Sequence, residues 1–195
     1  MKTVCLFCGS SRGGNPRYIE GAFKMGTLIA RRGMTLVYGG ATVGLMGAAA
    51  KGCLESGGRV IGVMPENLVK LEVAHAGLTE LIVVPSMHER KAKMNELSDG
   101  FITLPGGIGT LDETFEVITW RQLSLHEKPV GILNIDGFFD ALMAFLDRVV
   151  RDGFLREEHR NLLITDTDPE GLLDRMGNHR PAPVGKWFDI DAHRI

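Results

Sequence analysis

Short apolar runs alternate along this chain with longer segments in which apolar residues recur every three or four positions. The short runs are rich in β-branched residues and almost continuously apolar, a pattern typical of parallel strands covered on both faces. Continuous apolar runs of this length predict strands rather than helices. The predicted strands span residues 3–7, 35–38, 60–64, 81–84, 101–104, 130–133 and 162–165.

The segments between these runs carry helix start and stop signals. Asn15 and Pro16 are a typical N-cap and first helical residue, and Gly33 is placed to end that helix. Ser86 and Glu89 have the spacing of a capping box at the start of another helix. Further helices are predicted over residues 45–56, 110–123, 138–151 and 169–176.

Repeated strand–helix units predict an α/β fold in which a doubly wound, mostly parallel sheet has helices on both faces, in a Rossmann-like arrangement. A length of 195 residues fits a single domain. The repeating pattern fills residues 1–177, which we expect to form that domain. Residues 178–195 contain two prolines and no clear period, so they are expected to form a C-terminal tail.

Charge and cysteine content narrow the class of protein. The formal net charge of −2 gives no electrostatic footprint for nucleic acid or an anionic membrane. The three cysteines, Cys5, Cys8 and Cys53, indicate a reducing compartment rather than a disulfide framework. We interpret the first two as small apolar residues at a strand end, with thioredoxin-type redox chemistry as a weaker alternative. The uncharged stretch 33–50 is divided by glycines, which favours a buried strand–loop–helix over a membrane span. The sequence thus predicts a soluble, cytoplasmic protein.

Glycine is the one residue type in clear excess, at 25 of 195 residues or about 13%, against a usual share of roughly 7%. Three glycine clusters, at residues 9–14, 39–47 and 105–110, each follow a predicted strand and precede a predicted helix. In a doubly wound sheet such turns share the carboxyl edge, where ligands bind. One cluster alone would indicate only a tight turn. Three on one edge favour a nucleotide or sugar phosphate held by helix N-termini.

Two familiar phosphate loops are absent. No cluster contains the P-loop pattern G-x-x-x-x-G-K-[ST], and the dinucleotide fingerprint G-x-G-x-x-G is also missing, because no third glycine follows Gly107 and Gly109 at the required spacing. A P-loop nucleotidase and a dinucleotide-dependent redox enzyme are therefore disfavoured.

Charged residues accompany the third cluster. Thr110 lies at the predicted helix N-terminus, where its hydroxyl or N–H can donate to a phosphate. Asp112 is interpreted as a complement to the helix dipole, and Glu116 as a polar neighbour. Glu113 is the candidate catalyst, because a carboxylate beside a phosphate is costly unless it has a chemical role.

A second constellation surrounds the capping box. Arg90 and Lys91 place two cations at a helix start, which is unfavourable for the dipole and favours a phosphate ligand. Glu89 is interpreted as a capping residue, and the role of His88 stays open. The string from His88 is not H-E-x-x-H, and the histidines provide no metal-ligand set, so no metal is expected.

Taken together, these motifs resemble the LOG ("Lonely guy") family of cytokinin riboside 5′-monophosphate phosphoribohydrolases. The resemblance rests on V-C-L-F-C-G-S-S from Val4, V-Y-G-G from Val37, G-L-M-G from Gly44, M-H-E-R-K from Met87 and P-G-G-I-G-T-L-D-E from Pro105. It continues through W-R-Q-L from Trp120 and K-P-V-G from Lys128 to about residue 165. Relatives are often labelled lysine decarboxylases, yet nothing in the sequence marks a Schiff-base lysine or a pyridoxal phosphate site.

The resemblance implies hydrolysis of the N-glycosidic bond of a nucleoside 5′-monophosphate by a cytoplasmic homodimer that uses no cofactor. It assigns catalysis to Arg90 and Glu113. Departures from the family pattern are Ala41, where a third glycine is common, and Asp112, where glutamate is usual. The implied substrate contacts are Glu72, Arg90, Lys91, Gly107, Ile108, Gly109, Thr110, Leu111, Asp112, Glu113 and Thr119.

Two alternatives remain open at this stage. Unmodified AMP is a rival substrate, because the sequence does not show whether the pocket admits an isoprenoid group on N6 of the adenine. A non-catalytic carrier of a nucleotide or of molybdenum cofactor is a rival from another class, although the retention of both Arg90 and Glu113 argues against it.

Overall fold

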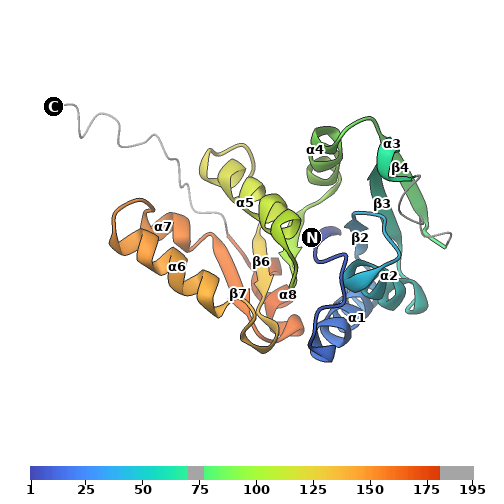
Figure 1. Ribbon diagram of the computed structural model, residues 1–195, viewed down its shortest axis with the longest axis horizontal. Helices are drawn as coiled ribbons and strands as arrows, with labels where there is room; N and C mark the ends of the chain where they lie inside the picture. The colour runs from blue at the N-terminus through green and yellow to red at the C-terminus, as the bar shows by residue number, and fades with distance from the viewer. Residues whose placement is uncertain (70–76, 181–195) are drawn as a thin grey trace.

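Seven parallel strands form one sheet at the centre of the computed structural model, which describes residues 1–69 and 77–180 (Figure 1). The order across the sheet is β4-β3-β2-β1-β5-β6-β7, and every neighbouring pair is parallel. The predicted α/β fold and its strands are confirmed, with boundaries shifted by no more than one residue. The strands are β1 (Thr3–Phe7), β2 (Thr35–Tyr38), β3 (Val60–Pro65), β4 (Glu80–Val84), β5 (Gly100–Thr103), β6 (Val130–Leu133) and β7 (Leu163–Asp166).

Helices connect successive strands and cover both faces of the sheet. The long ones are α1 (Pro16–Arg31), α2 (Gly44–Glu55), α4 (Met87–Leu97), α5 (Ile108–Gln122), α6 (Asp140–Arg151) and α8 (Pro169–Gly177). The short elements α3 (Glu66–Val69), η1 (Ile135–Gly137) and α7 (Glu157–Arg160) are absent from the sequence-based prediction, because a single turn is too short to show a period. The predicted tail from residue 178 follows α8, and from residue 181 it lies outside the described residues.

Three predicted helix ends are confirmed at their caps, whereas α5 begins at Ile108, two residues before the predicted start at Thr110. Asn15 accepts a hydrogen bond from the N–H of Arg17 at 3.0 Å, and Gly33 has a φ of +67° just after α1. Ser86 caps α4 by accepting from the N–H of Glu89 at 3.2 Å. The start of α6 was predicted too early. Asn134 holds the preceding turn by accepting from the Phe139 N–H at 2.7 Å, and the helix begins only at Asp140.

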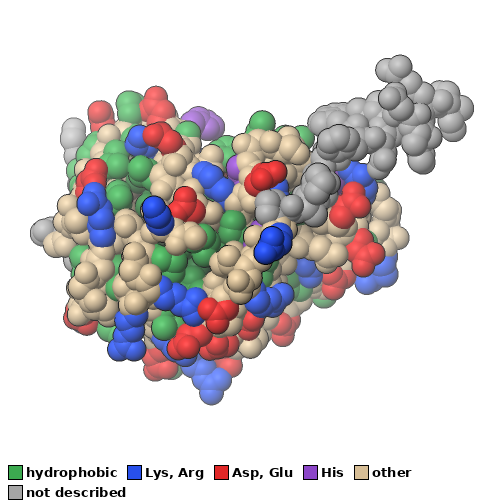
Figure 2. Space-filling model, turned by 180° about the vertical axis from the view of Figure 1, so that it is seen from behind, with side chains coloured by type: hydrophobic (Ala, Val, Ile, Leu, Met, Phe, Trp, Pro, Cys, Tyr) green, Lys and Arg blue, Asp and Glu red, His purple; other side chains and the backbone are tan. Residues whose placement is uncertain are grey.

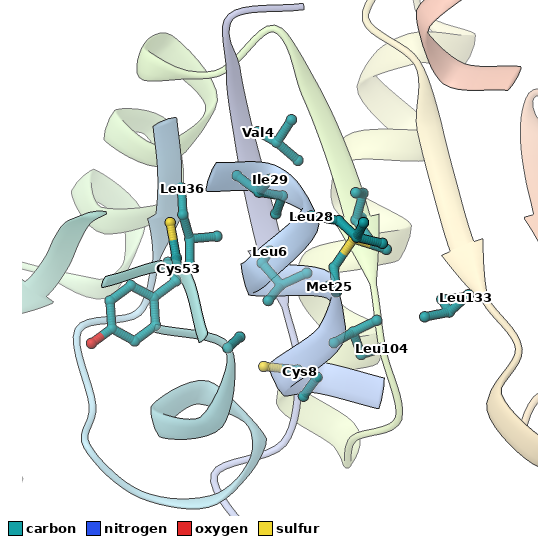
Figure 3. Close-up of a cluster of buried hydrophobic side chains, with 14 of the residues drawn as sticks. Val4, Leu6, Cys8, Met25, Leu28, Ile29, Leu36, Cys53, Leu104 and Leu133 are labelled. Carbon is teal, nitrogen blue, oxygen red and sulfur yellow. The ribbon is translucent and has the colours of Figure 1, made fainter. Parts of the chain in front are cut away.

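The core consists of two apolar layers, one on each face of the sheet. Helices α1, α2 and α8 cover one face, and α4, α5 and α6 cover the other. In Figure 3, side chains of α1 such as Met25 and Ile29 lie over Val4 and Leu6 of β1. Strand alternation sends the next residue along, Cys5, into the opposite layer. Both faces of the central strands are therefore buried, as their continuous apolar sequence predicted.

Chain direction across the sheet reverses at β1. From β1 the chain proceeds outward through β2 and β3 to β4, and then α4 returns it to β5 on the other side of β1. The β1–α1 and β5–α5 loops consequently diverge at one point of the carboxyl edge. In open α/β sheets this point forms the ligand-binding crevice.

The surface shows no concentration of one charge on the face in Figure 2, where acidic and basic side chains are interspersed with apolar ones. Several large apolar side chains are nevertheless exposed, including Phe145 of α6, which is 62% exposed. Among the residues that the structure describes, no helix has both the length and the apolar character needed to cross a membrane.

Candidate active site at the carboxyl edge of the sheet

Three glycine-containing loops meet where β1, β2 and β5 end. The N–H of Gly9 donates to the Pro105 carbonyl at 3.0 Å, and the N–H of Leu45 donates to the Gly9 carbonyl at 3.0 Å. A Cβ on Gly106 would lie 2.9 Å from the Gly9 nitrogen and 2.7 Å from the Thr110 Cβ, so only glycine permits this approach. The glycines predicted to share one edge do meet there, and the Gly9 loop is in direct backbone contact with each of the other two loops.

A cavity of about 480 Å³ opens between these loops and the starts of α4 and α5. Charged groups of both signs line it: Arg90 and Lys91 from α4, and Asp112 and Glu113 from α5. Apolar side chains complete the wall, among them some that the sequence did not single out. The remaining lining residues are Cys8, Gly9, Ser10, Met46, Leu68, Met87, Gly107, Ile108, Gly109 and Thr110.

The N-terminus of α5 faces this cavity. Its N-cap is Gly107, which has no side chain with which to satisfy the first N–H groups of the helix. A Cβ on Gly107 or Gly109 would meet no protein atom within 4 Å, and neither residue has a left-handed φ. Nothing within the described protein therefore requires glycine at these two positions. Open space and the positive end of a helix dipole are features that favour the binding of an anion.

Arg90 and Glu113 face each other across the cavity. The Arg90 Nη2 lies 3.9 Å from the Glu113 Oε1, and the two side chains are only 12% and 15% exposed. Arg90 also donates from Nε to the Val63 carbonyl at 3.1 Å, which anchors the guanidinium at the end of β3. Burial raises the pKa of Glu113, and the nearby Arg90 charge opposes that rise. The two candidate catalysts thus form a partly desolvated ion pair.

Lys91 is held by two carboxylates of α5. Its Nζ lies 3.0 Å from the Glu116 Oε1 and 3.2 Å from the Asp112 Oδ2. Burial lowers the pKa of Lys91, but the hydrogen bonds to Glu116 and Asp112 outweigh burial and leave the pKa above its ordinary value. The structure corrects two interpretations here. Asp112 does more than complement a helix dipole, and Glu116 is an ion-pair partner rather than a mere polar neighbour.

Other residues named from the sequence lie outside the cavity wall. Leu111 packs against the core, and its N–H is bonded to the Gly107 carbonyl at 3.1 Å. Thr119 is exposed, and its hydroxyl donates to the Phe115 carbonyl at 2.7 Å. Glu72 lies outside the described residues. Substrate contacts by these three residues stay predictions.

The cysteines lack the environment of a redox pair. Cys5 and Cys8 belong to opposite apolar layers of the sheet. Burial raises the pKa of both thiols, whereas reactive cysteines need a depressed pKa. The thioredoxin-type alternative is therefore wrong. Within residues 1–69 and 77–180, no group of three or more His, Cys, Asp or Glu side chains is arranged to hold a metal ion.

Three residues that anchor or line the site were not predicted from the sequence to do so. The Val63 carbonyl that anchors Arg90 is a backbone group, so its residue type carries no signal. Met46 and Leu68 line the cavity from α2 and α3, yet in the sequence they look like ordinary apolar residues. Contacts of this kind depend on strand order and helix packing, which no local sequence signal records.

Comparison with known structures reveals the same fold in proteins of low sequence identity. A molybdenum cofactor binding protein from Rippkaea orientalis superposes with a TM-score of 0.69 at 24% identity, covering 91% of this chain and 96% of that one. The Moco carrier protein from Chlamydomonas reinhardtii gives a TM-score of 0.68 at 21% identity, with coverages of 90% and 94%. At these identities the likeness concerns the fold alone.

Sequence comparison is more specific. Residues 46–176 match the family model described as "Possible lysine decarboxylase". The chain is 46% identical to "Probable cytokinin riboside 5'-monophosphate phosphoribohydrolase LOGL9" of Oryza sativa subsp. japonica, over 93% of this chain and 80% of that protein. It is 42% identical to "Cytokinin riboside 5'-monophosphate phosphoribohydrolase LOG5" of Arabidopsis thaliana, over 95% of this chain and 81% of that protein. The chain therefore belongs to the LOG family, whose model carries the lysine decarboxylase label.

Proposed function

We propose that this protein hydrolyses the N-glycosidic bond of a nucleoside 5′-monophosphate and releases a free adenine-type base and ribose 5-phosphate. The observation that carries the proposal is the ion pair of Arg90 and Glu113, which lines a cavity at a helix N-terminus. Support also comes from the relatives in rice and Arabidopsis, which bear the name of this activity.

The start of α5 would hold the 5′-phosphate. The first N–H groups of the helix and the space above Gly107 and Gly109 suit an anion there. Glu113 follows Ile108 by five residues, which places it about 7–8 Å further along the helix axis. That separation is of the order of a ribose ring with its 5′ carbon. Binding energy from the phosphate would thus position C1′ of the ribose beside the carboxylate.

Glu113 would act in its ionised form. Cleavage of the bond between C1′ and the base nitrogen leaves its electron pair on the base and develops positive charge on the ribose. A carboxylate beside C1′ stabilises that charge and accepts a proton from the attacking water as the water oxygen bonds to C1′. The departing base takes up a proton from solvent, and the carboxylate returns its own proton to solvent. A positioned general base contributes a factor of about 10²–10⁴ to the rate. Arg90 would keep Glu113 ionised against the effect of burial.

The geometry does not support lysine decarboxylation. A Schiff base requires a neutral lysine amine, which enzymes obtain by lowering the lysine pKa. Lys91, the lysine that lines the cavity, instead has a raised pKa because Glu116 and Asp112 hold its ammonium. The carrier alternative explains the fold but assigns no role to the buried pair of Arg90 and Glu113.

The finer points of the proposal concern substrate, assembly and location. We propose N6-modified adenosine monophosphates and AMP as substrates, a homodimer as the working form, and the cytoplasm as its location. Support for a dimer comes from large apolar side chains exposed beside the cavity, since Met87 is 43% and Ile108 is 87% exposed. Sedimentation of the purified chain tests the assembly.

The decisive experiment measures base release by chromatography from isopentenyladenosine 5′-monophosphate, AMP and adenosine. We expect both monophosphates to react and adenosine to react poorly, because it lacks the anchoring phosphate. Glu113→Gln keeps size and polarity but cannot ionise, so it should retain binding and lose most turnover. Nucleotide binding without base release by the wild-type protein would favour the carrier alternative and overturn the proposal.

A further inference from the structure

Gly39 lies at a position where the backbone conformation does not itself require glycine. It directly follows β2 at the carboxyl edge and is buried. Its φ lies outside the left-handed region, unlike that of the next residue, Gly40, whose φ is +85°. An alanine at position 39 is therefore compatible with the main chain, and the reason for glycine must lie in what packs against it.

The atoms that pack against Gly39 belong to the Arg90 guanidinium. A Cβ on Gly39 would collide with the Arg90 Nη2 and would lie 3.2 Å from its Cζ. It would also lie 3.1 Å from the Met46 Sδ, at the end of a side chain that can move. The guanidinium thus occupies the volume that any side chain at position 39 would fill.

The guanidinium has little freedom to give way. Its Nε donates to the Val63 carbonyl at 3.1 Å, and its Nη1 lies 3.4 Å from the Met87 Sδ. Because the guanidinium is rigid and planar, these contacts together with Gly39 fix where Nη2 lies, and Nη2 is the atom nearest Glu113.

We propose that Gly39 is a positioning residue for Arg90: the absence of its side chain forms a seat, completed by the Val63 carbonyl, that holds Nη2 against Glu113. This proposal deepens the proposed function, and its catalytic part rests on that function. Gly39 itself contacts no reacting atom, and its effect on catalysis passes through Arg90. An alanine there displaces Nη2 or breaks the bond to Val63, and in either case weakens the attraction that keeps Glu113 ionised.

A double-mutant cycle tests the seat. Gly39→Ala should lower kcat roughly tenfold or more and move the acid limb of the kcat/KM profile to higher pH. In the Arg90→Ala background the seat is empty, so adding Gly39→Ala should change kcat less than about twofold. Gly177→Ala at the end of α8 is the matched control, since its Cβ would meet no atom within 4 Å and its φ is not left-handed. It should leave kcat unchanged.

Thermal unfolding of the same four proteins provides a readout that does not depend on activity. Gly39→Ala should lower Tm when Arg90 is present and leave it unchanged in the Arg90→Ala background. This thermal cycle still tests the seat if Gly39→Ala folds poorly, because the double variant should then fold. It also tests the seat if the wild-type protein releases no base, because Tm does not depend on activity. Equal losses of kcat or Tm in both backgrounds, or a Gly39→Ala protein with wild-type kcat, Tm and pH profile, would overturn the proposal.

Discussion

The ionisation of Glu113 in the proposed reaction should depend on neighbouring charges of both signs, of which Arg90 and Asp112 have larger effects than Lys91 and Glu116. Burial raises the pKa of Glu113, the Arg90 charge lowers it, and the Asp112 charge raises it. The acid limb of kcat/KM reports this ionisation in the free enzyme. Arg90→Gln should therefore move the acid limb to higher pH, and Asp112→Asn should move it to lower pH.

The size of the Arg90 effect follows from the geometry. At 3.9 Å and an effective dielectric constant of about 20, two unit charges attract by about 4 kcal/mol. Water in the open cavity screens part of this, and we take about 1–2 kcal/mol as the working value. A free-energy change of 1.36 kcal/mol corresponds to a factor of ten in ionisation. At pH values below the pKa of Glu113, Arg90→Gln should therefore lower kcat/KM by about 5–30-fold more than it does at high pH, where Glu113 is fully ionised.

The assay follows base release from one nucleoside monophosphate across a series of buffers at constant ionic strength. The substrate phosphate also titrates near pH 6, but it contributes identically to every variant, so the differences between profiles belong to the enzyme. Gly177→Ala again serves as a control with an unchanged profile. Lys91 stays paired with Glu116 when Asp112 is replaced, which limits secondary effects of that substitution.

Three results would contradict the reasoning. If both variants moved the acid limb in the same direction, the shift would not arise from the signs of the two charges. If neither moved it, Glu113 would not be the group whose ionisation controls the reaction. A uniform loss of rate at every pH in Arg90→Gln would indicate that Arg90 acts on the substrate alone.

Three further predictions concern polar side chains on α5 or just after it. Thr114→Val should lower the free energy of unfolding by about 1–3 kcal/mol and lower Tm, because it leaves the buried Thr103 hydroxyl without its partner, the Thr114 hydroxyl at 2.8 Å. In calorimetry, the variant with valine at both positions should recover part of this lost stability. Burial lowers the pKa of His126 from 6.5 to about 4, so the folded state favours the neutral imidazole. The contribution of neutral His126 to the free energy of unfolding is fully present above pH 6.5 and should be lost as pH falls toward 4. Denaturant titrations should show that this acid loss is smaller in His126→Gln, and equal slopes would contradict the assignment. Glu116→Gln should lower KM several-fold by freeing Lys91 for the phosphate, and an unchanged or higher KM would show that Lys91 needs both carboxylates.

Local signals in the sequence determined most of the fold. A cap such as Asn15 with Pro16 acts through bonds to residues two or three positions away, so it is legible in a single segment. Continuous apolar runs identified the strands because both faces of a parallel sheet are buried. Because all neighbouring strands are parallel, the glycine loops that follow them lie on one edge, as the alternating pattern predicted.

Short or irregular elements were missed for the same physical reason. A four-residue helix such as α7 (Glu157–Arg160) contains no repeat of the apolar pattern. The start of α6 depends on the Asn134 side chain, which competes for the backbone groups of the preceding turn. Neither feature has a signature that separates it from an ordinary loop.

The sequence by itself predicted that Arg90 and Glu113 lie at one edge of the sheet, because each lies near the start of a helix that follows a parallel strand. Only the tertiary structure decided how they are used. Lys91 meets Glu116, 25 positions away, and Arg90 meets Val63 and Gly39 across larger separations. Such contacts depend on the packing of one strand end against another helix, and no local pattern records them. The electrostatic state of the site, a buried carboxylate balanced by one anchored arginine, is a property of that packing.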